Sequence, residues 1–217
     1  MDRIERLCAF LDCCRVFADV ACDHGYCAEY MLKNGLCESA VISDISEKSL
    51  AKAEKLLSEF TASGKCRAVC CDGLENIDGA DEVLIAGIGG AEIIKILQNA
   101  YIPEKFIFQP MKNAKALRKY LLQSGCKIIC DDLFTDGKKY YFVIKGTRTG
   151  GGQSYLKAQL EYGKDSLFNP VLKSYIKEEL SKKRGYLMRG LSESAQAEIQ
   201  DEIRFMEEVL REVDRNT

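Results

Sequence analysis

The chain has 217 residues, of which 47% are hydrophobic and 29% charged, and this composition excludes an intrinsically disordered or fibrous protein. Its net charge of −2 hides an asymmetry, because residues 1–104 carry −8, residues 105–189 carry +11 and residues 190–217 carry −5. A basic block between acidic ones favours a polyanionic partner such as a nucleic acid.

The start of the chain and its cysteines favour a reducing, cytoplasmic location. The first residues lack the apolar run of a signal peptide, and no stretch approaches the roughly 20 apolar residues of a membrane span. The eleven cysteines are an odd number without paired CxxC motifs. We therefore expect free thiols that are mostly buried, no structural metal site and no membrane contact.

Short apolar segments alternate with longer segments of helical periodicity over the first part of the chain. Such β–α repeats with apolar strands predict an α/β protein, with a parallel sheet covered by helices on both faces. The predicted strands are residues 16–21, 40–44, 67–71, 82–86 and 106–109, and the predicted helices are residues 3–14, 26–33, 46–60, 89–100 and 113–123.

The pattern then changes, because residues 127–130 and 140–144 read as two strands with only a turn signal at Thr135-Asp136-Gly137 between them. The sheet is therefore expected to end in an antiparallel hairpin. The glycine-rich residues 146–153 are interpreted as a flexible boundary between a domain of residues 1–148 and one of residues 154–217.

The second domain is predicted to be a small antiparallel hairpin of α-helices. Asn169-Pro170 supplies an N-cap and a proline in the first turn of a helix that ends near Arg189. Ser192 begins a last helix with an apolar stripe, and Gly190 lies between the two helices.

Acidic residues occur at the ends of three predicted strands. Asp19 precedes the first loop, Asp44 ends the second strand and Asp72 follows the third, whereas the fourth ends in Gly87-Ile88-Gly89-Gly90. Ligands of open parallel sheets bind at these carboxyl ends. Asp44 is suited to accept hydrogen bonds from a ribose diol, and Asp72 from the amine of an adenine.

The first loop distinguishes two classes of adenosine cofactor. It contains one glycine and no GxGxxG motif, and its Asp19 and Asp23 would repel the pyrophosphate of a dinucleotide. A cationic sulfonium with an amino-acid tail would not be repelled. The residues thus favour S-adenosylmethionine over NAD.

Four segments resemble the sequence blocks of the bacterial tRNA (adenine-N1)-methyltransferases that act on position 22. They are residues 18–26 (ADVACDHGY), 71–74 (CDGL), 85–90 (IAGIGG) and 108–110 (FQP). The resemblance covers residues 1–148 by motif and residues 150–217 by architecture. It implies a Rossmann-like class I methyltransferase sheet with a helical, coiled-coil-like C-terminal domain, S-adenosylmethionine as cofactor and tRNA as partner.

The chain departs from that family at two positions. Ala21 stands where the family usually has glycine, and Asn113 lies two places beyond the family's asparagine. With the resemblance, the predicted cofactor-binding residues are Asp19, Ala21, Cys22, Asp23, His24, Asp44, Ile45, Asp72, Gly73, Leu74, Ala86, Gly87 and Gly89.

The expected acceptor, adenine N1, carries an in-plane lone pair, so methyl transfer needs no general base. Catalysis is then mostly positioning and stabilisation of the cationic product, and no residue is assigned a proton-transfer role. The candidates to face the base are Asp23, Tyr26, Gln109 and Asn113.

Basic residues of two segments are predicted to bind RNA, although each run is also typical of a solvated helix face. Two other functions remain open: methylation of a small molecule, and non-catalytic binding of a nucleotide or RNA. The basic block argues against the first and the glycine cluster against the second. The predicted RNA-binding residues are Lys112, Lys115, Arg118, Lys119, Lys182, Lys183, Arg184 and Arg189.

Overall fold

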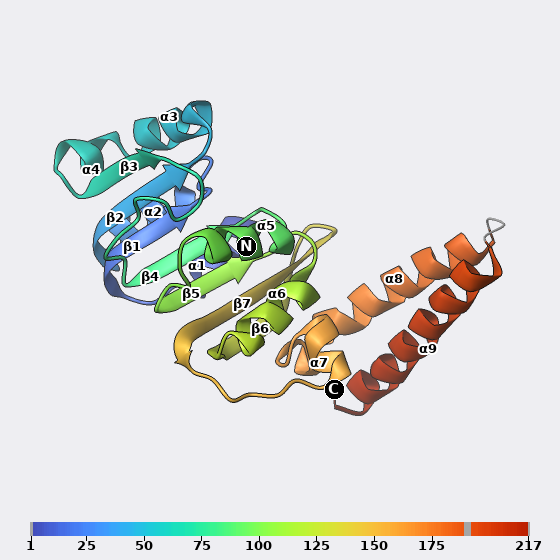
Figure 1. Cartoon of the computed structure of the whole chain (residues 1–217). Helices are drawn as coiled ribbons and strands as arrows, with labels where there is room; N and C mark the ends of the chain where they lie inside the picture. Colours follow the sequence, from blue (N-terminus) through green and yellow to red (C-terminus); the bar gives the residue numbers. More distant parts are fainter. Residues whose placement is uncertain (1, 189–191, 217) are drawn as a thin grey trace.

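A computed structural model describes residues 2–188 and 192–216 of the chain (Figure 1). The strands of these residues are β1 (Cys14–Val20), β2 (Cys37–Asp44), β3 (Cys66–Cys70), β4 (Glu82–Ala86), β5 (Lys105–Gln109), β6 (Cys126–Asp136) and β7 (Lys139–Gly150). They form one sheet in the order β3-β2-β1-β4-β5-β7-β6. β1 to β5 are parallel, and β7 is antiparallel to β5 and β6. The predicted Rossmann-like sheet with a terminal antiparallel hairpin is therefore confirmed.

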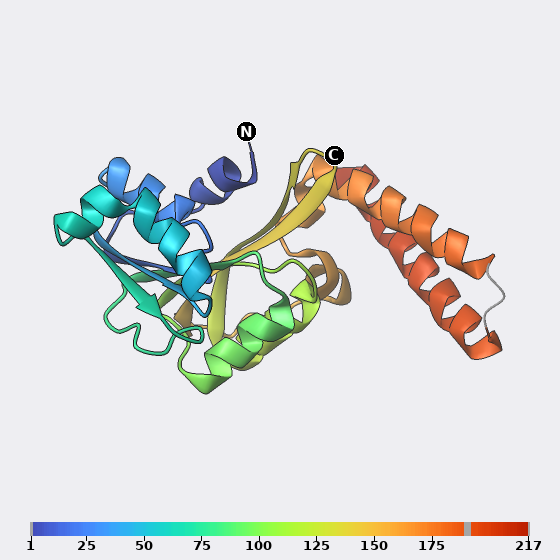
Figure 2. The same cartoon turned by 90° about the horizontal axis from the view of Figure 1, so that it is seen from above.

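Helices cover both faces of this sheet, as the alternation of strands and helices predicts. They are α1 (Arg3–Cys8), α2 (Tyr26–Lys33), α3 (Glu47–Leu56), α4 (Ser58–Ala62), α5 (Gly90–Asn99) and α6 (Ala114–Gln123). Figure 2 shows α1 to α4 on one side of the sheet and α5 and α6 on the other. Phe17, Ile42 and Leu84 belong to the core of the first side, and Val83 and Phe106 to that of the second.

The first predicted helix is shorter than its periodicity suggests. α1 ends at Cys8 and β1 begins at Cys14, although residues 3–14 were expected to be one helix. The residues that precede the neighbouring strands β2 and β4 hold this segment in the sheet. The Cys14 N–H donates to the Leu36 carbonyl, and the Val16 N–H donates to the Asp81 carboxylate at 2.9 Å. The predicted helix 46–60 is likewise two helices, because the chain turns at the fully buried Leu57.

The glycine-rich segment 146–153 is not a flexible boundary, because residues 146–150 belong to the sheet and Gln153 is hydrogen-bonded to it. β7 continues to Gly150, and the Gln153 side chain exchanges two hydrogen bonds with the backbone of Ile128, at 2.7 and 3.0 Å. A Cβ at Gly146 would lie 2.4 Å from the Lys127 carbonyl oxygen. The glycine therefore allows two strands to approach closely, a role that its composition alone does not distinguish from flexibility.

The remaining chain is helical, as predicted: α7 (Lys157–Tyr162), a 3-10 turn (Ser166–Phe168), α8 (Pro170–Leu187) and α9 (Glu193–Asn216). α8 and α9 form an antiparallel pair that projects away from the sheet (Figures 1 and 2). Its core includes Leu172, Ile176 and Met206 together with Leu133 of β6. The helices thus pack on the end of the sheet, and the division into two domains stays a prediction. Arg189 and Gly190 lie outside the described residues.

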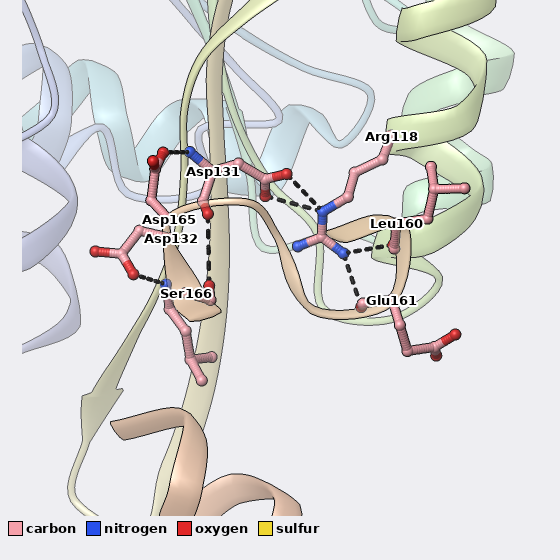
Figure 3. A network of polar contacts seen from close by, with 8 residues as sticks. Arg118, Asp131, Asp132, Leu160, Glu161, Asp165 and Ser166 are labelled. Carbon is pink, nitrogen blue, oxygen red and sulfur yellow. Dashed lines mark hydrogen bonds and ion pairs between the residues drawn. The ribbon is translucent and has the colours of Figure 1, made fainter. Parts of the chain in front are cut away.

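Arg118 joins the sheet to the C-terminal segment (Figure 3). The expectation that it lies on an exposed, RNA-binding face of α6 is wrong, because its side chain is fully buried. Its Nε donates to both carboxylate oxygens of Asp131 in β6, at 2.8 and 2.9 Å. Its Nη1 donates to the carbonyl oxygens of Leu160 and Glu161 in α7, at 3.2 and 2.9 Å. The α7 segment covers a helix face that would otherwise be solvated.

Backbone contacts reinforce this junction. The Asp131 N–H donates to the Asp165 carboxylate at 2.8 Å, and the Asp165 N–H donates to the Asp131 carbonyl at 3.0 Å. Figure 3 shows these residues on facing segments of β6 and the chain after α7. The two segments are therefore fixed relative to each other before α8 begins.

Arg118→Met should lower the free energy of unfolding by about 3–5 kcal/mol, because Asp131 would remain as a buried charge without a partner. Urea denaturation would measure the change. Lys119→Met, at the exposed neighbouring position of the same helix, is the matched control and should stay within about 0.5 kcal/mol of the wild type.

The double variant Arg118→Met with Asp131→Leu should recover most of that loss, since replacing both ions by apolar side chains removes the unpaired charge. Equal stabilities of the wild type and the Arg118→Met protein would show that the buried pair does not hold the junction together.

Candidate functional site

A cavity of about 670 Å³ lies at the carboxyl ends of the parallel strands. Residues at the ends of β1, β2 and β4 and in the loops after β1 to β4 line it, together with residues of α1 and α5. Of the predicted cofactor-binding residues, those in the lining are Asp19, Ala21, Cys22, Asp23, His24, Asp44, Ile45, Asp72, Gly73, Ala86 and Gly87. Most of the predicted site is thus brought together at one edge of the sheet.

The first loop has an unusual backbone. Ala21 and Asp23 adopt left-handed conformations with φ of 58° and 48°, and Gly25 follows with φ of 72°. The Cys22 N–H donates to the Ser43 carbonyl at 3.0 Å, which holds the loop over the end of β2. Because an L-residue with φ above zero is strained, the fold maintains this loop shape at a cost in free energy.

Asp44 is oriented by the backbone around it. Its carboxylate accepts hydrogen bonds from the Asp23 N–H at 3.2 Å and from the Ser46 N–H at 2.9 Å. Ile45, beside it, is 71% exposed and presents an apolar surface at the cavity wall. Asp72 is exposed and also lines the cavity, so two carboxylates are available there at adjacent strand ends.

Asp23 is an exposed anion beside the Lys52 ammonium and the His24 imidazole. Its carboxylate lies 3.0 Å from Lys52 Nζ and 2.8 Å from His24 Nδ1. The hydrogen bond from Lys52, with a smaller effect of His24, lowers the pKa of Asp23. The His24 ring stacks on Tyr26, with ring centres 5.3 Å apart and planes tilted by 2°. The loop therefore presents an ionised carboxylate and a flat aromatic pair at the cavity.

Asp19 differs from the other loop acids because it is only 5% exposed. Burial, together with the charge of Asp44, raises the pKa of Asp19 to about 7, although a hydrogen bond from the Ala28 N–H at 3.3 Å opposes this shift. Ala28 is in the first turn of α2. Asp19 therefore anchors the start of α2 as well as lining the cavity.

Two predicted cofactor-binding residues do not line the cavity. Leu74 is buried in the core beside Ile77, because the chain turns inward after Gly73. Gly89 is the N-cap of α5, and at the next position a Cβ on Gly90 would lie 2.6 Å from the Asn113 carbonyl oxygen. The absence of a side chain at Gly90 thus allows the loop before α6 to lie close to the start of α5.

The candidates to face a target base separate into two pairs. Asp23 and Tyr26 line the cavity, whereas Gln109 and Asn113 do not. Gln109 is fully buried at the end of β5, and Asn113 begins α6 in a left-handed conformation with φ of 58°.

The predicted RNA-binding cations mostly have acidic partners. Lys115 lies 2.7 Å from Glu161, and Lys112 lies 3.8 Å from Glu92. Lys119 is exposed and forms no ion pair with another described residue. Arg189 lies outside the described ranges.

The three predicted RNA-binding residues of α8 are also paired with acids. Lys182 pairs with Glu178 and Glu179 of its own helix, whereas the pairs Lys183–Glu202 and Arg184–Glu207 link α8 to α9. The basic run of the sequence is thus largely neutralised within the helical hairpin.

Arg3 and Lys95 line the cavity although the sequence did not single them out. Arg3 lies in α1, 15 positions before the first motif block, and Lys95 lies inside α5. Only the tertiary structure brings them to the site, since neither has a recognisable spacing to the motifs.

All eleven cysteines are free thiols, and six of them are buried. In the described part of the chain, no group of three or more His, Cys, Asp or Glu residues could hold a metal ion. None of the described helices is both long and apolar enough to span a bilayer.

Residues 1–144 match the family model described as a methyltransferase domain. A Mycoplasma pneumoniae protein named as a candidate tRNA methyltransferase is 32% identical over 148 residues, which are 65% of this chain and 68% of that protein. The tRNA (adenine(22)-N(1))-methyltransferase of Bacillus subtilis is 26% identical over 148 residues, covering 65% of this chain and 62% of the enzyme. The matches thus span about two thirds of these relatives.

A solved structure covers more of the chain. TrmK of M. capricolum, in complex with the cofactor product S-adenosyl-homocysteine, superposes with a TM-score of 0.89 and 22% identity over 97% of both chains. At this identity the likeness shows the fold, including the C-terminal helices. These comparisons confirm the resemblance that the four sequence blocks indicate.

Ala21→Gly should raise the free energy of unfolding by about 0.5–1 kcal/mol, because relief of the left-handed strain exceeds the added entropy of the unfolded chain. The matched control is Ala51→Gly on the exposed face of α3, which should lower it by about 1 kcal/mol. Urea denaturation measures both, and a loss of stability in both variants would contradict the strain at Ala21.

Asp19→Asn should remove a pH-dependent loss of stability. The folded Asp19 has a pKa of about 7, whereas an unperturbed aspartate titrates near 3.9, about three units lower. Between these values the unfolded chain releases a proton that the folded chain keeps, so Asp19 makes the free energy of unfolding fall as the pH rises from about 4 to about 7.

Because asparagine does not titrate, the stability of Asp19→Asn relative to the wild type should increase from about pH 5 to about pH 8 in urea denaturation. A stability difference that is the same at both pH values would show that Asp19 is ionised throughout this range.

Proposed function

Because the chain belongs to the methyltransferase domain family, we propose that it transfers a methyl group from S-adenosylmethionine to N1 of adenine 22 in tRNA. The observation that carries this proposal is the cavity at the strand ends, which brings together Asp44, Asp72 and the first loop. The adenine position rests on the resemblance to the tRNA (adenine(22)-N(1))-methyltransferase of Bacillus subtilis.

The residues of the cavity fit the proposed cofactor. Its volume of about 670 Å³ lies within the range of about 300–1,000 Å³ that is usual for small-molecule sites. The oriented Asp44 carboxylate would accept hydrogen bonds from both ribose hydroxyls, and the Asp72 carboxylate would accept one from the adenine amine. The exposed Ile45 side chain offers an apolar surface for the adenine ring. S-adenosylmethionine supplies an electrophilic methyl group on a cationic sulfur.

The chain's contribution to the reaction is positioning and charge. As the N1–methyl bond forms, the sulfur–methyl bond breaks, and the positive charge moves from the sulfur to the adenine ring. Asp23, kept ionised by Lys52, places a carboxylate near this charge. The stacked His24 and Tyr26 rings offer a flat surface for an unstacked base. No group on the chain has to remove a proton.

The tRNA is proposed to lie along the cations Lys112, Lys115, Lys119, Lys182, Lys183 and Arg184. Those that have ion-pair partners remain compatible with this role, because exposed pairs contribute only about 0–1 kcal/mol and can exchange for phosphates. The edge of adenine that carries N1 is the Watson–Crick edge, so the target base has to leave any pairing before it reacts.

The proposal is tested by incubating the protein with S-adenosylmethionine and unmodified tRNA and analysing the nucleosides by mass spectrometry. N1-methyladenosine should appear, and a matched tRNA with guanine at position 22 should remain unmodified. Methylation of another base, or of small molecules only, would overturn the assignment. Cofactor binding without methylation of any substrate would favour a non-catalytic binding protein.

Asp44→Ala and Asp72→Ala should each weaken binding of S-adenosylmethionine by about 1–3 kcal/mol, because each removes hydrogen bonds to a charged acceptor. Asp78→Ala is the matched control, since Asp78 is exposed and outside the cavity lining. Calorimetric affinities that are unchanged in both cavity variants would exclude this cofactor orientation.

Replacing Lys182, Lys183 and Arg184 together by glutamine should raise the KM for tRNA and reduce its salt dependence, by about one phosphate contact for each cation that binds RNA. Binding of S-adenosylmethionine should not change, because none of the three residues lines the cavity. Lys65→Gln, an exposed change at the other end of the sheet, controls for loss of charge. An unaltered KM would exclude these three residues from the tRNA surface.

A further inference from the structure

Arg3 is a cation in the wall of the cavity whose position is fixed by local structure. It is the first residue of α1, and a capping box holds this end of the helix: the Glu5 N–H donates to Asp2 at 2.9 Å, and the Asp2 N–H donates to Glu5 at 2.9 Å. The short helix therefore begins at a defined point beside the cavity.

The Arg3 side chain is held on three sides by neutral groups. Its Nε donates to Gln109 Oε1 at 2.9 Å, and its guanidinium carbon lies 5.4 Å from the centre of the Tyr141 ring. It also packs over Gly87, where a Cβ would lie 2.9 Å from Nη2. Within the described residues no carboxylate forms an ion pair with it.

The contact with Gln109 explains why a fully buried amide stands at the end of β5. A guanidinium only donates hydrogen bonds, so the amide oxygen has to face Arg3. Gln109 Nε2 lies 3.5 Å from Met111 Sδ on the other side. The amide oxygen is thus occupied by Arg3, and it is Arg3, not Gln109, that lines the cavity.

The charges around the cavity leave few places for an anionic group. The acidic residues in its lining are Asp19, Asp23, Asp44, Asp72, Glu75 and Glu92. Apart from the His24 imidazole, the basic residues in its lining are Arg3 and Lys95. Lys95 precedes Ile96, which packs on Gly73 after β3, on the side proposed for the adenine. Arg3 lies at the ends of β4 and β5, on the opposite side.

The proposed cofactor carries one anionic group, the α-carboxylate of its methionine part, at the end away from the adenine. With neighbouring strands about 4.8 Å apart, the ends of β2 and β5 are separated by roughly 14 Å, and those of β2 and β4 by roughly 10 Å. An adenosine with an amino-acid tail can span such distances. Its carboxylate then arrives on the Arg3 side.

We propose that Arg3 binds the α-carboxylate of S-adenosylmethionine, and that Gln109 is a positioning residue that holds the guanidinium toward the cavity. This inference rests on the proposed function. The remaining guanidinium N–H groups are suited to a carboxylate, which they bind with charge-assisted hydrogen bonds. Arg3 thus recognises the part of the cofactor that Asp44 and Asp72 do not contact.

The test compares two ligands that differ in the amino-acid part. S-adenosyl-homocysteine contains the carboxylate, whereas 5′-methylthioadenosine has the same adenosine and sulfur without it. In calorimetry, Arg3→Gln should lose about ten- to a hundredfold in affinity for S-adenosyl-homocysteine, the usual effect of losing a charged hydrogen bond. Its affinity for 5′-methylthioadenosine should change less than about twofold, which also shows that the variant is folded.

Two further variants separate charge from packing. Arg6→Gln, on the exposed part of the same helix and outside the cavity lining, should bind both ligands like the wild type. Gln109→Glu has nearly the same shape but places a carboxylate against Arg3, so it should lower the affinity for S-adenosyl-homocysteine only. If Gln109 only supported the shape of the cavity, this variant would lower the affinity for both ligands.

An unchanged affinity of Arg3→Gln for S-adenosyl-homocysteine would overturn the inference, and a raised KM for tRNA in that variant would assign Arg3 to an RNA phosphate instead. Equal losses for both ligands would also overturn it, since Arg3 would then only shape the cavity. If the wild-type chain binds neither ligand, the proposed function fails first.

Discussion

The buried ion pair between Arg118 and Asp131 is the contact on which the position of the C-terminal helices depends. It links α6 to β6, and the same guanidinium binds the last carbonyl groups of α7. It also lies 4.9 Å from the centre of the Phe142 ring in β7. Because two charges inside a protein are tolerated only while both partners are in place, these four elements keep one arrangement. The α8–α9 hairpin starts from that fixed point.

The cavity also depends on how the surrounding groups set the charge and orientation of three aspartates at the carboxyl ends of the strands. Burial makes Asp19 titrate near neutral pH, backbone N–H groups orient Asp44, and Lys52 keeps Asp23 ionised. Side chains of one type therefore have different environments: one anchors α2, one faces the proposed ribose site, and one remains an exposed anion. The strained backbone at Ala21 and Asp23 holds the loop in the shape that separates them.

The charge asymmetry of the sequence is partly compensated in the folded chain. Residues 105–189 carry +11 and residues 190–217 carry −5, and the two blocks meet where α8 packs on α9. The pairs Lys173–Asp214, Lys183–Glu202 and Arg184–Glu207 connect them. A charge count along the chain therefore overestimates the basic surface available to a polyanion, although exposed pairs of this kind are weak enough to exchange.

The sequence by itself determined the parallel sheet, the terminal hairpin, the helical C-terminal part and the strand-end residues of the cavity. Apolar strands and helical periodicity are local patterns, and residues at the ends of neighbouring parallel strands necessarily meet at one edge of the sheet. Asp44 and Asp72 could be identified in this way, since Asp44 ends one recognisable strand and Asp72 comes just after the next.

Only the tertiary structure decided the roles of Arg118, Gly146 and Arg3. The spacing of Arg118 suits a solvated helix face, but α7 covers that face and a carboxylate from β6 pairs with it. Gly146 looks like part of a linker, yet a backbone carbonyl of the neighbouring strand leaves no room for a Cβ. Arg3 reaches the cavity because α1 packs beside β7, through a contact between residues far apart in the sequence. Such contacts depend on which segments meet in space, and local periodicity carries no information about that.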